Sequence, residues 1–388
     1  MIEIKDKTKC CGCGACEQVC PKHSITMRED SEGFLYPHVN KDLCIDCGLC
    51  NKVCQYDVPF QPASKPIMQY GYVTHDVEER KNSSSGAFFM AAAKHILNLG
   101  GIVFGSMFDS EWSVVVGGAS DLEEIKRFQG SKYVQSRTGD SFRQIKEKLE
   151  SGLWVLFCGT PCQVSGLNHY LRKDYEKLIS IDFTCHAVPS PGIWREYLKT
   201  IAGDRYQICY VNFRNKEVDG WRNYGLQIDG VDNNEARTTL VYEGNKQNLY
   251  MQGFLKYLYC RPSCSNCAAR GFNTHSDIMI GDFWHVEHYH DEALLNDNNG
   301  VSLVMTMTPK GQNLLDAIRD KGFLLEVNES EIELDKTHQC ILKSERPHRL
   351  RSLFFKMKNI LGLRFSIWLC VKPYQKLINL IYKFTIVR

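Results

Sequence analysis

The sequence predicts an α+β or α/β protein in three parts: a small cysteine-rich domain, a larger mixed body and a basic helical tail. Nine of the eighteen cysteines lie before residue 55. Strand-like and helix-like segments then alternate, which is typical of a mixed α/β body. No acidic residue follows Arg349. We expect the first domain at 1–60, a proline-rich linker at 61–69, the body at 70–335 and the tail at 336–388.

The composition is that of an ordinary globular protein that does not bind nucleic acid. Of the 388 residues, 43% are hydrophobic and 24% are charged, and the net charge is +2. A charge this small gives no field that would attract nucleic acid. The start, "MIEIKDKTKC", lacks the apolar core of a signal peptide. We therefore expect a reducing, cytoplasmic location, where clustered cysteines indicate metal ligands rather than disulfides or scattered buried thiols.

Two cysteine runs in the first domain have the spacing of bacterial ferredoxins. "CCGCGACEQVCP" follows C-x2-C-x2-C-x3-C-P, and "CIDCGLCNKVC" repeats the spacing with Gln55 in place of the proline. In this pattern the fourth cysteine of each run ligates the other cluster. Cys11 is left without a role. We predict two 4Fe-4S clusters, one held by Cys10, Cys13, Cys16 and Cys54, the other by Cys20, Cys44, Cys47 and Cys50.

Apolar patterning predicts the elements of the domain and the body. Between the two cysteine runs we expect a hairpin with its turn at residues 30–33. In the body, helices are expected at 86–101 and 141–152. Strands are expected at 69–74, 102–108, 112–119, 153–157, 178–183 and 276–284.

Several stretches of the body have the residue types of binding sites. In "RKNSSSGAFF", serines and a glycine precede a helix, which suits a phosphate, although a capped helix is the common alternative. In "VLFCGTPCQVSGL" and "IDFTCHAVPSP", a cysteine follows a buried strand. Ligands bind at the carboxyl ends of such strands, so Cys162 and Cys185 are candidates for one shared site. In "SDIMIGDFW", an acid and aromatics at a strand end suit either a ring ligand or a packed turn.

"CRPSCSNC" poses a separate question. Cys260, Cys264 and Cys267 have the C-x3-C-x2-C spacing by which radical enzymes hold a cluster against S-adenosylmethionine. Such a triad normally stands near the start of its domain, whereas this one follows some 250 residues. We therefore do not favour the radical enzyme.

Taken in order, these segments resemble a known family. The double ferredoxin run, "SSSGAFF", "GSKYVQS", "GTPCQVSGL", "CHAVPSP", "RPSCSNC" and "SDIMIGDFW" are similar to the beta-subunit family of coenzyme F-420 hydrogenases and dehydrogenases over about residues 1–310. The resemblance implies an iron–sulfur flavoprotein oxidoreductase with FAD. It also implies that Cys260 stands outside the family's pattern, and that Ala187 replaces a usual glycine.

The resemblance further implies a third metal site and a flavin site. The third 4Fe-4S cluster is expected at Cys162, Cys185, Cys264 and Cys267, with structural zinc as the competing possibility. Lys132 and His186 are the candidate catalytic residues, the histidine as a proton donor or, alternatively, as a packing residue. The expected FAD-binding residues are Ser83, Ser84, Ser85, Gly86, Lys132, Tyr133 and Gln135.

The expected partners are a ferredoxin-like one-electron donor or acceptor and a small-molecule substrate. The alternative is a non-catalytic subunit that relays electrons to a partner enzyme, for instance in polysaccharide biosynthesis.

The tail combines basic and apolar residues at helical spacing. From Arg349 onward it carries nine Lys or Arg, together with Trp and Phe. Basic amphipathic helices of this kind lie on anionic membrane surfaces. We expect either such peripheral contact or a helix pair packed on the body, with the break between the two helices at Pro373.

Overall fold

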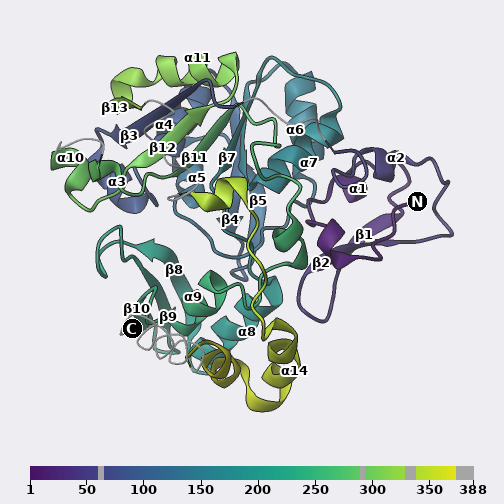
Figure 1. The fold of residues 1–388 in the computed structure, drawn as a ribbon, viewed down its shortest axis with the longest axis vertical. Coiled ribbons are helices and arrows are strands. Elements are labelled where there is room, and N and C mark those ends of the chain that lie inside the picture. The colour runs from purple at the N-terminus through teal and green to yellow at the C-terminus, as the bar shows by residue number, and fades with distance from the viewer. Residues whose placement is uncertain (60–64, 289–292, 328–337, 373–388) are drawn as a thin grey trace, which may run out of the picture.

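The computed structural model describes residues 1–59, 65–288, 293–327 and 338–372. Part of the predicted linker, the predicted boundary between body and tail at residue 335, and Pro373 with the rest of the tail lie outside the described residues. The remainder has the predicted three-part organisation and mixed α/β class, with the cysteine-rich domain beside the body (Figure 1).

An eight-stranded mixed sheet forms the centre of the body, with the strand order β13-β3-β12-β11-β7-β6-β4-β5 (Figure 1). The pairs β4–β6, β6–β7 and β7–β11 are parallel, and the other pairs are antiparallel. All six predicted strands are present. The strands are β3 (Met68–Thr74), β4 (Ile102–Phe108), β5 (Val114–Ala119), β6 (Val155–Gly159), β7 (Leu178–Phe183), β11 (Ile278–Asp282), β12 (Ser302–Thr306) and β13 (Gly322–Val327).

Helices cover both faces of this sheet. One face packs against α4 (Phe88–Asn98) and α11 (Pro309–Ala317), the other against α6 (Ser141–Glu150) and α7 (Pro161–Leu171). Helix α6 buries Phe142, Ile145 and Leu149, an apolar stripe at helical spacing. Shorter elements complete the body: α3 (Val77–Asn82), α5 (Leu122–Ile125), η2 (Lys126–Phe128), η3 (Pro262–Asn266), η4 (Val286–His288), α10 (Ala293–Asn296), η5 (Arg319–Lys321) and α13 (Gln339–Leu342).

The cysteine-rich domain is a hairpin with short helical turns. Strands β1 (Ile25–Glu29) and β2 (Leu35–Val39) pair antiparallel, and the Asp30 carboxylate closes the predicted turn by accepting from the N–H groups of Glu32 and Phe34. The turns are η1 (Lys7–Lys9), α1 (Ala15–Gln18) and α2 (Leu49–Lys52). The small core of the domain includes four of its cysteines, so thiol packing replaces much of the apolar core that so short a segment lacks.

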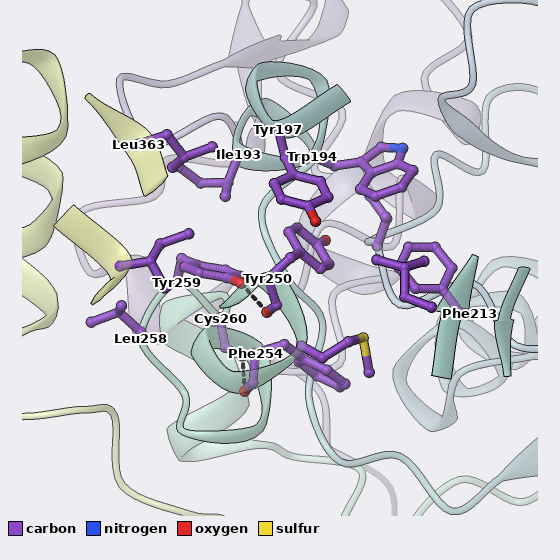
Figure 2. Close-up of a cluster of buried hydrophobic side chains, with 14 of the residues drawn as sticks. Ile193, Trp194, Tyr197, Phe213, Tyr250, Phe254, Leu258, Tyr259, Cys260 and Leu363 are labelled. Atoms are coloured by element: carbon purple, nitrogen blue, oxygen red, sulfur yellow. Dashed lines mark hydrogen bonds between the residues drawn. The ribbon is translucent and has the colours of Figure 1, made fainter. Parts of the chain in front are cut away.

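A second lobe, which the sequence did not predict, lies below the main sheet in Figure 1. Strands β8 (Gln207–Asn215), β9 (Gly225–Val231) and β10 (Arg237–Gly244) form an antiparallel sheet. Helices α8 (Pro191–Ala202), α9 (Leu249–Leu255) and α14 (Arg351–Leu361) pack with it around an aromatic core. Figure 2 shows the centre of that core, where Trp194, Tyr197 and Tyr250 lie together.

The tail packs on this lobe with one apolar face. Helix α14 ends before Gly362, whose φ of +77° interrupts the helix, and residues 363–372 are helical again. A break therefore falls at Gly362, while the predicted break at Pro373 lies outside the described residues. Phe354, Leu363 and Ile367 are buried in the aromatic core. In the part of the chain that the structure describes, no helix is both long and apolar enough to cross a membrane.

Candidate functional site

The eight ferredoxin cysteines line two hollows, and the hollows follow the predicted crossover. The inner pocket is lined by Cys10, Cys13, Cys16 and Cys54, with Ile2, Ile4 and Val53 among its other walls. The outer pocket is lined by Cys20, Cys44, Cys47 and Cys50, with Ile25 and Val39. Four thiols around a small, largely apolar hollow suit a 4Fe-4S cluster, because the thiolates ligate the irons and the apolar walls limit water.

The two pockets differ in their surroundings. Every residue that lines the outer pocket belongs to the first fifty, and the Cys47 side chain is exposed. The inner pocket lies against the body: Cys13 lies so close to Gly166 of α7 that a Cβ on this glycine would be 2.8 Å from the Cys13 Cβ. The inner pocket is therefore the one nearer to the body's candidate sites.

Arg261 fixes the inner pocket to the body. Its side chain is buried, and it donates from Nε to the Cys10 carbonyl at 2.7 Å and from Nη1 to the Gln135 Oε1 at 2.9 Å. Gln135 in turn donates from Nε2 to the Cys11 carbonyl at 2.8 Å. Gln135, which the resemblance assigned to the flavin, thus has one end of its amide on Arg261 and the other on the ferredoxin domain. Arg261 was missed although it stands inside the quoted "CRPSC" segment.

The third predicted cysteine group gathers at the ends of two neighbouring parallel strands. Gly159 of β6 pairs with Asp182 of β7, and Cys162 and Cys185 each follow three positions later. Cys264 lies on η3, and Cys267 directly follows that turn. Burial raises the pKa of the Cys185 thiol, and the three other thiols raise it further, which places all four within electrostatic reach.

Arg270 holds the loop after β7. It donates from Nη1 to the Cys185 carbonyl at 2.6 Å and from Nη2 to the His186 carbonyl at 3.0 Å.

Among the described residues, no three Cys, His, Asp or Glu side chains are arranged to hold a single metal ion. The identity of the metal at the third group remains a prediction.

Cys260 does not belong to the third group. It is buried beside the aromatic core, where its thiol donates to the Phe254 carbonyl at 3.7 Å (Figure 2). Burial raises its pKa well above the usual value for a thiol. The C-x3-C-x2-C spacing thus combines one core cysteine with two cysteines of the third group, in agreement with the expectation that Cys260 stands apart.

His186 is a packed, neutral imidazole. Its ring stacks on Tyr257 with centroids 4.3 Å apart, and its Nδ1 lies 3.0 Å from the Tyr257 hydroxyl. Burial lowers the pKa of His186 to about 4. Desolvation disfavours the charged form of the ring, which argues against proton donation near neutral pH and favours the packing role that the sequence left open. The catalytic role of His186 stays a prediction.

The serine loop before α4 is closely packed, and its polar groups already have protein partners. Ala87, in a left-handed conformation, occupies the N-cap without a side-chain hydrogen bond, so the serines do not cap α4. A Cβ on Gly86 would lie 2.0 Å from the Tyr72 carbonyl oxygen. The side chain of Ser83 bonds to Gln129, that of Ser84 to Ser131 and that of Ser85 to the Val301 carbonyl, while the Gly86 N–H donates to Ser302.

Basic side chains surround this loop. Arg214 donates to the Ser84 carbonyl at 3.0 Å, and Lys216 donates to the Ser85 carbonyl at 3.2 Å. Lys132 is close in sequence to Ser131 and donates to the carbonyls of Gln129 and Gly130. Burial lowers the pKa of Lys132 to about 7, so the amine can gain or lose a proton near neutrality. The loop fits an anionic group by charge, while its hydroxyls offer only their remaining hydrogen-bonding capacity.

Arg214 and Asp282 form a buried ion pair beside the loop. Two parallel hydrogen bonds of 2.9 Å join the guanidinium to the carboxylate, and Arg214 also donates to the Tyr133 hydroxyl at 3.3 Å. Trp221 donates from Nε1 to Asp282 at 2.8 Å, and its ring stacks on Trp284 with centroids 4.6 Å apart. The acid and aromatic of "GDFW" thus pack against the second lobe. Arg214 and Trp221 were missed because nothing in the segment 207–244 suggested a site.

Two parts of the chain match known protein families. Residues 153–332 match the family described as the C terminus of the coenzyme F-420 hydrogenase/dehydrogenase beta subunit, and residues 9–58 match the 4Fe-4S dicluster domain. Residues 153–332 thus form the C-terminal domain of the coenzyme F-420 hydrogenase/dehydrogenase beta-subunit family, and a 4Fe-4S dicluster domain precedes them in this chain. The dicluster domain supports iron–sulfur clusters in this chain, and the two matches together support a role in electron transfer and oxidoreduction.

One solved structure is similar to a large part of this chain. A chain of the F-420-reducing NiFe hydrogenase complex from Methanosarcina barkeri, studied by xenon derivatization, has 16% sequence identity. The match covers 72% of this chain and 88% of that chain, with a TM-score of 0.46. No curated protein matches the chain.

Proposed function

We propose that this protein is an iron–sulfur flavoprotein oxidoreductase that takes electrons singly from a ferredoxin-like donor and passes them in pairs to a small-molecule substrate. When bound, 4Fe-4S clusters supply one-electron transfer, and FAD supplies the conversion between one-electron and two-electron chemistry. The observation that carries the proposal is the arrangement of three cysteine groups in a row, from an exposed end of the chain into the body.

The row begins at the outer pocket, where Cys47 is open to a docking partner. The inner pocket comes next, because Cys16 and Cys50 pack in the same small core. The third group follows, since Gln55, directly after the inner pocket's Cys54, contacts the Cys162 carbonyl at 3.0 Å. The row supports a path that runs from the surface to the carboxyl edge of the main sheet, where ligands of α/β folds bind.

At that edge the chain's own residues provide charge and a titrating group. Lys216 and Arg214 donate to the carbonyls of the serine loop and so fix its shape. Arg214 is paired with Asp282, and burial lowers the pKa of Lys216 to about 7, so a bound anion would favour the charged form of this lysine. We assign the loop of residues 83–86 to the phosphate groups of FAD on the basis of this charge. Lys132 would neutralise negative charge that develops on a reduced ring and, with its pKa near 7, hold or release a proton. We assign Tyr133 to ring contact because it follows Lys132, although its ring also packs against Phe213 and Phe254 of the second lobe.

The test is the cofactor content of the full chain purified without oxygen. The proposal expects about twelve irons, matching sulfide and one FAD. Cys162→Ser should lose about four irons, whereas Cys209→Ser, which removes an exposed thiol on β8, should lose none. About eight irons without flavin would contradict the proposal and leave a simple electron carrier. Twelve irons without flavin would favour the relay subunit over the enzyme. Zinc in place of the last four irons would identify the third group as a zinc site.

The tail adds a proposed location. Ile360, Phe365 and Trp368 expose 83%, 50% and 44% of their surface, although the opposite face of the same segment is buried. Lys356 and Arg364, on the same segment, are also exposed, and no acid follows Glu345. We propose that this face lies on an anionic membrane surface, because exposed aromatic and aliphatic side chains with basic neighbours bind there.

A further inference from the structure

Two departures from the ferredoxin pattern meet at one place in the fold. Cys11 is an extra cysteine in the first run, and Gln55 stands where the motif has proline in the second. They are 44 positions apart in sequence, yet both side chains are buried at the junction between the inner pocket and the third group.

Hydrogen bonds from Gln55 reach both sides of the junction. The Gln55 amide donates from Nε2 to the Cys11 sulfur at 3.2 Å and to the Cys162 carbonyl at 3.0 Å. Cys11 and Gln55 both line the inner pocket together with Cys13, and the Cys11 thiol interacts with Cys13 and with Cys162, lowering the pKa of each of these two thiols. One of these is a predicted ligand of the inner pocket and the other of the third group. A proline at position 55 has no side-chain donor and would make neither of the Gln55 contacts.

Neither residue is needed as a ligand. The inner pocket and the third group each have four cysteines without Cys11, which completes the ligand set of a cubane cluster. Nor does the site offer room for a separate function, because Cys11 and Gln55 expose only 7% and 3% of their surface. What remains for them is to act on the sulfurs that they contact.

Hydrogen bonds to cysteine sulfur change the energy of a cluster's oxidation states. A donor stabilises the reduced state more, because the reduced cluster carries more negative charge, and it therefore raises the reduction potential. In a buried site this effect is little screened by water.

We propose that Cys11 and Gln55 form a hydrogen-bonded bridge between the inner pocket and the third group, which raises the reduction potentials of the clusters held there. The inference rests on the proposed function, since it requires a cluster at each of these two sites. Both residues are positioning residues: they act through Cys13 and Cys162 rather than by binding substrate.

The expected size of the effect follows from the strength of one hydrogen bond to a charged acceptor. Losing such a bond changes the ratio of oxidised to reduced cluster about tenfold at a given potential. For one electron, tenfold corresponds to about 59 mV. We expect each single substitution to lower at least one midpoint potential by a shift of this order.

The experiment is a redox titration followed by electron paramagnetic resonance on the full chain, prepared without oxygen. The variants are Gln55→Leu, which removes the donor at similar size, Gln55→Pro, which restores the motif, and Cys11→Ala. The controls are Cys209→Ala and Gln247→Leu, which lie on the surface of the second lobe. We expect about twelve irons in every protein, lower midpoints in the three variants and unchanged midpoints in the controls.

The outcomes separate this inference from the proposed function. Unchanged midpoints in Gln55→Leu and Cys11→Ala, with about twelve irons retained, would overturn the inference alone. Loss of about four irons from Gln55→Leu would also overturn it, because the amide would then be needed to assemble a cluster rather than to set its potential. About eight irons in the unmodified chain would defeat the proposed third cluster itself.

Discussion

Replacing Asp282 by Asn should destabilise the body strongly, because it leaves a buried cation without its counter-ion. The Arg214 side chain is 4% exposed, and its two 2.9 Å bonds to Asp282 are the only ion pair that it makes among the described residues. Removing one partner of a buried pair costs about 3–5 kcal/mol. Because Arg214 keeps its bonds to the Ser84 carbonyl and the Tyr133 hydroxyl, we expect the lower end, about 3 kcal/mol.

The assay is urea unfolding followed by tryptophan fluorescence at neutral pH, with the unfolding slope compared between variants. Removing both charges, in Arg214→Met with Asp282→Asn, should cost less than Asp282→Asn alone, because no buried charge is left unpaired. The matched control is Glu217→Gln, which breaks an exposed pair with Lys81 and should leave the midpoint unchanged. A loss below about 1 kcal/mol for Asp282→Asn would refute the argument, since it would make the pair equivalent to a surface one.

Three further predictions concern the amine, the tail and the loop. The pKa of Lys132 falls from 10.5 to about 7 on folding, so between pH 7 and 10.5 the unfolded chain binds more protons and the stability should rise with pH. In Lys132→Met, the urea midpoint of unfolding should depend less on pH over this range. The same pH dependence in the variant would contradict the burial of the amine. Gly86→Ala should cost about 1–3 kcal/mol in the same assay, since its Cβ would lie 2.0 Å from a carbonyl oxygen, and more than Gly71→Ala, where the nearest atom is at 3.3 Å; equal costs would contradict the close packing. Replacing Ile360, Phe365 and Trp368 together by serine should lower the fraction of protein that floats with vesicles of phosphatidylcholine and roughly one third phosphatidylserine at least tenfold. Equal flotation of the variant and the unmodified chain would argue against membrane contact.

The main sheet was predictable because its strands carry their signal locally. The apolar runs at 153–157 and 178–183 are bounded by helix and turn signals, and they became the buried central strands β6 and β7. The second lobe was not predictable in this way. Strand β8 exposes parts of both faces and pairs with β9 through two register shifts, so it has no clean alternation. Its core comes from α8, α9 and α14, which are far apart in sequence.

The candidate site also combines features that the local sequence predicts with contacts that only the folded chain reveals. The crossover of the eight ferredoxin cysteines followed from spacing alone, because a short ligand run has few ways to wrap a cluster. The contacts of Cys11, Gln55 and Arg261 depend on how the domain docks, which spacing does not encode. For the serines of residues 83–85, the residue types alone suggested a phosphate site. The fold shows that their hydroxyls already bond to protein groups.

The exposure of Cys47 sets an order of vulnerability to air. Under the proposed arrangement, oxygen reaches the outer pocket first, since Cys47 is exposed there, whereas none of the four cysteines of the third group is exposed. Oxidative damage would then begin at the outer pocket and reach the third group last. A briefly aerated sample would be cut off from its electron donor while still holding its innermost metal.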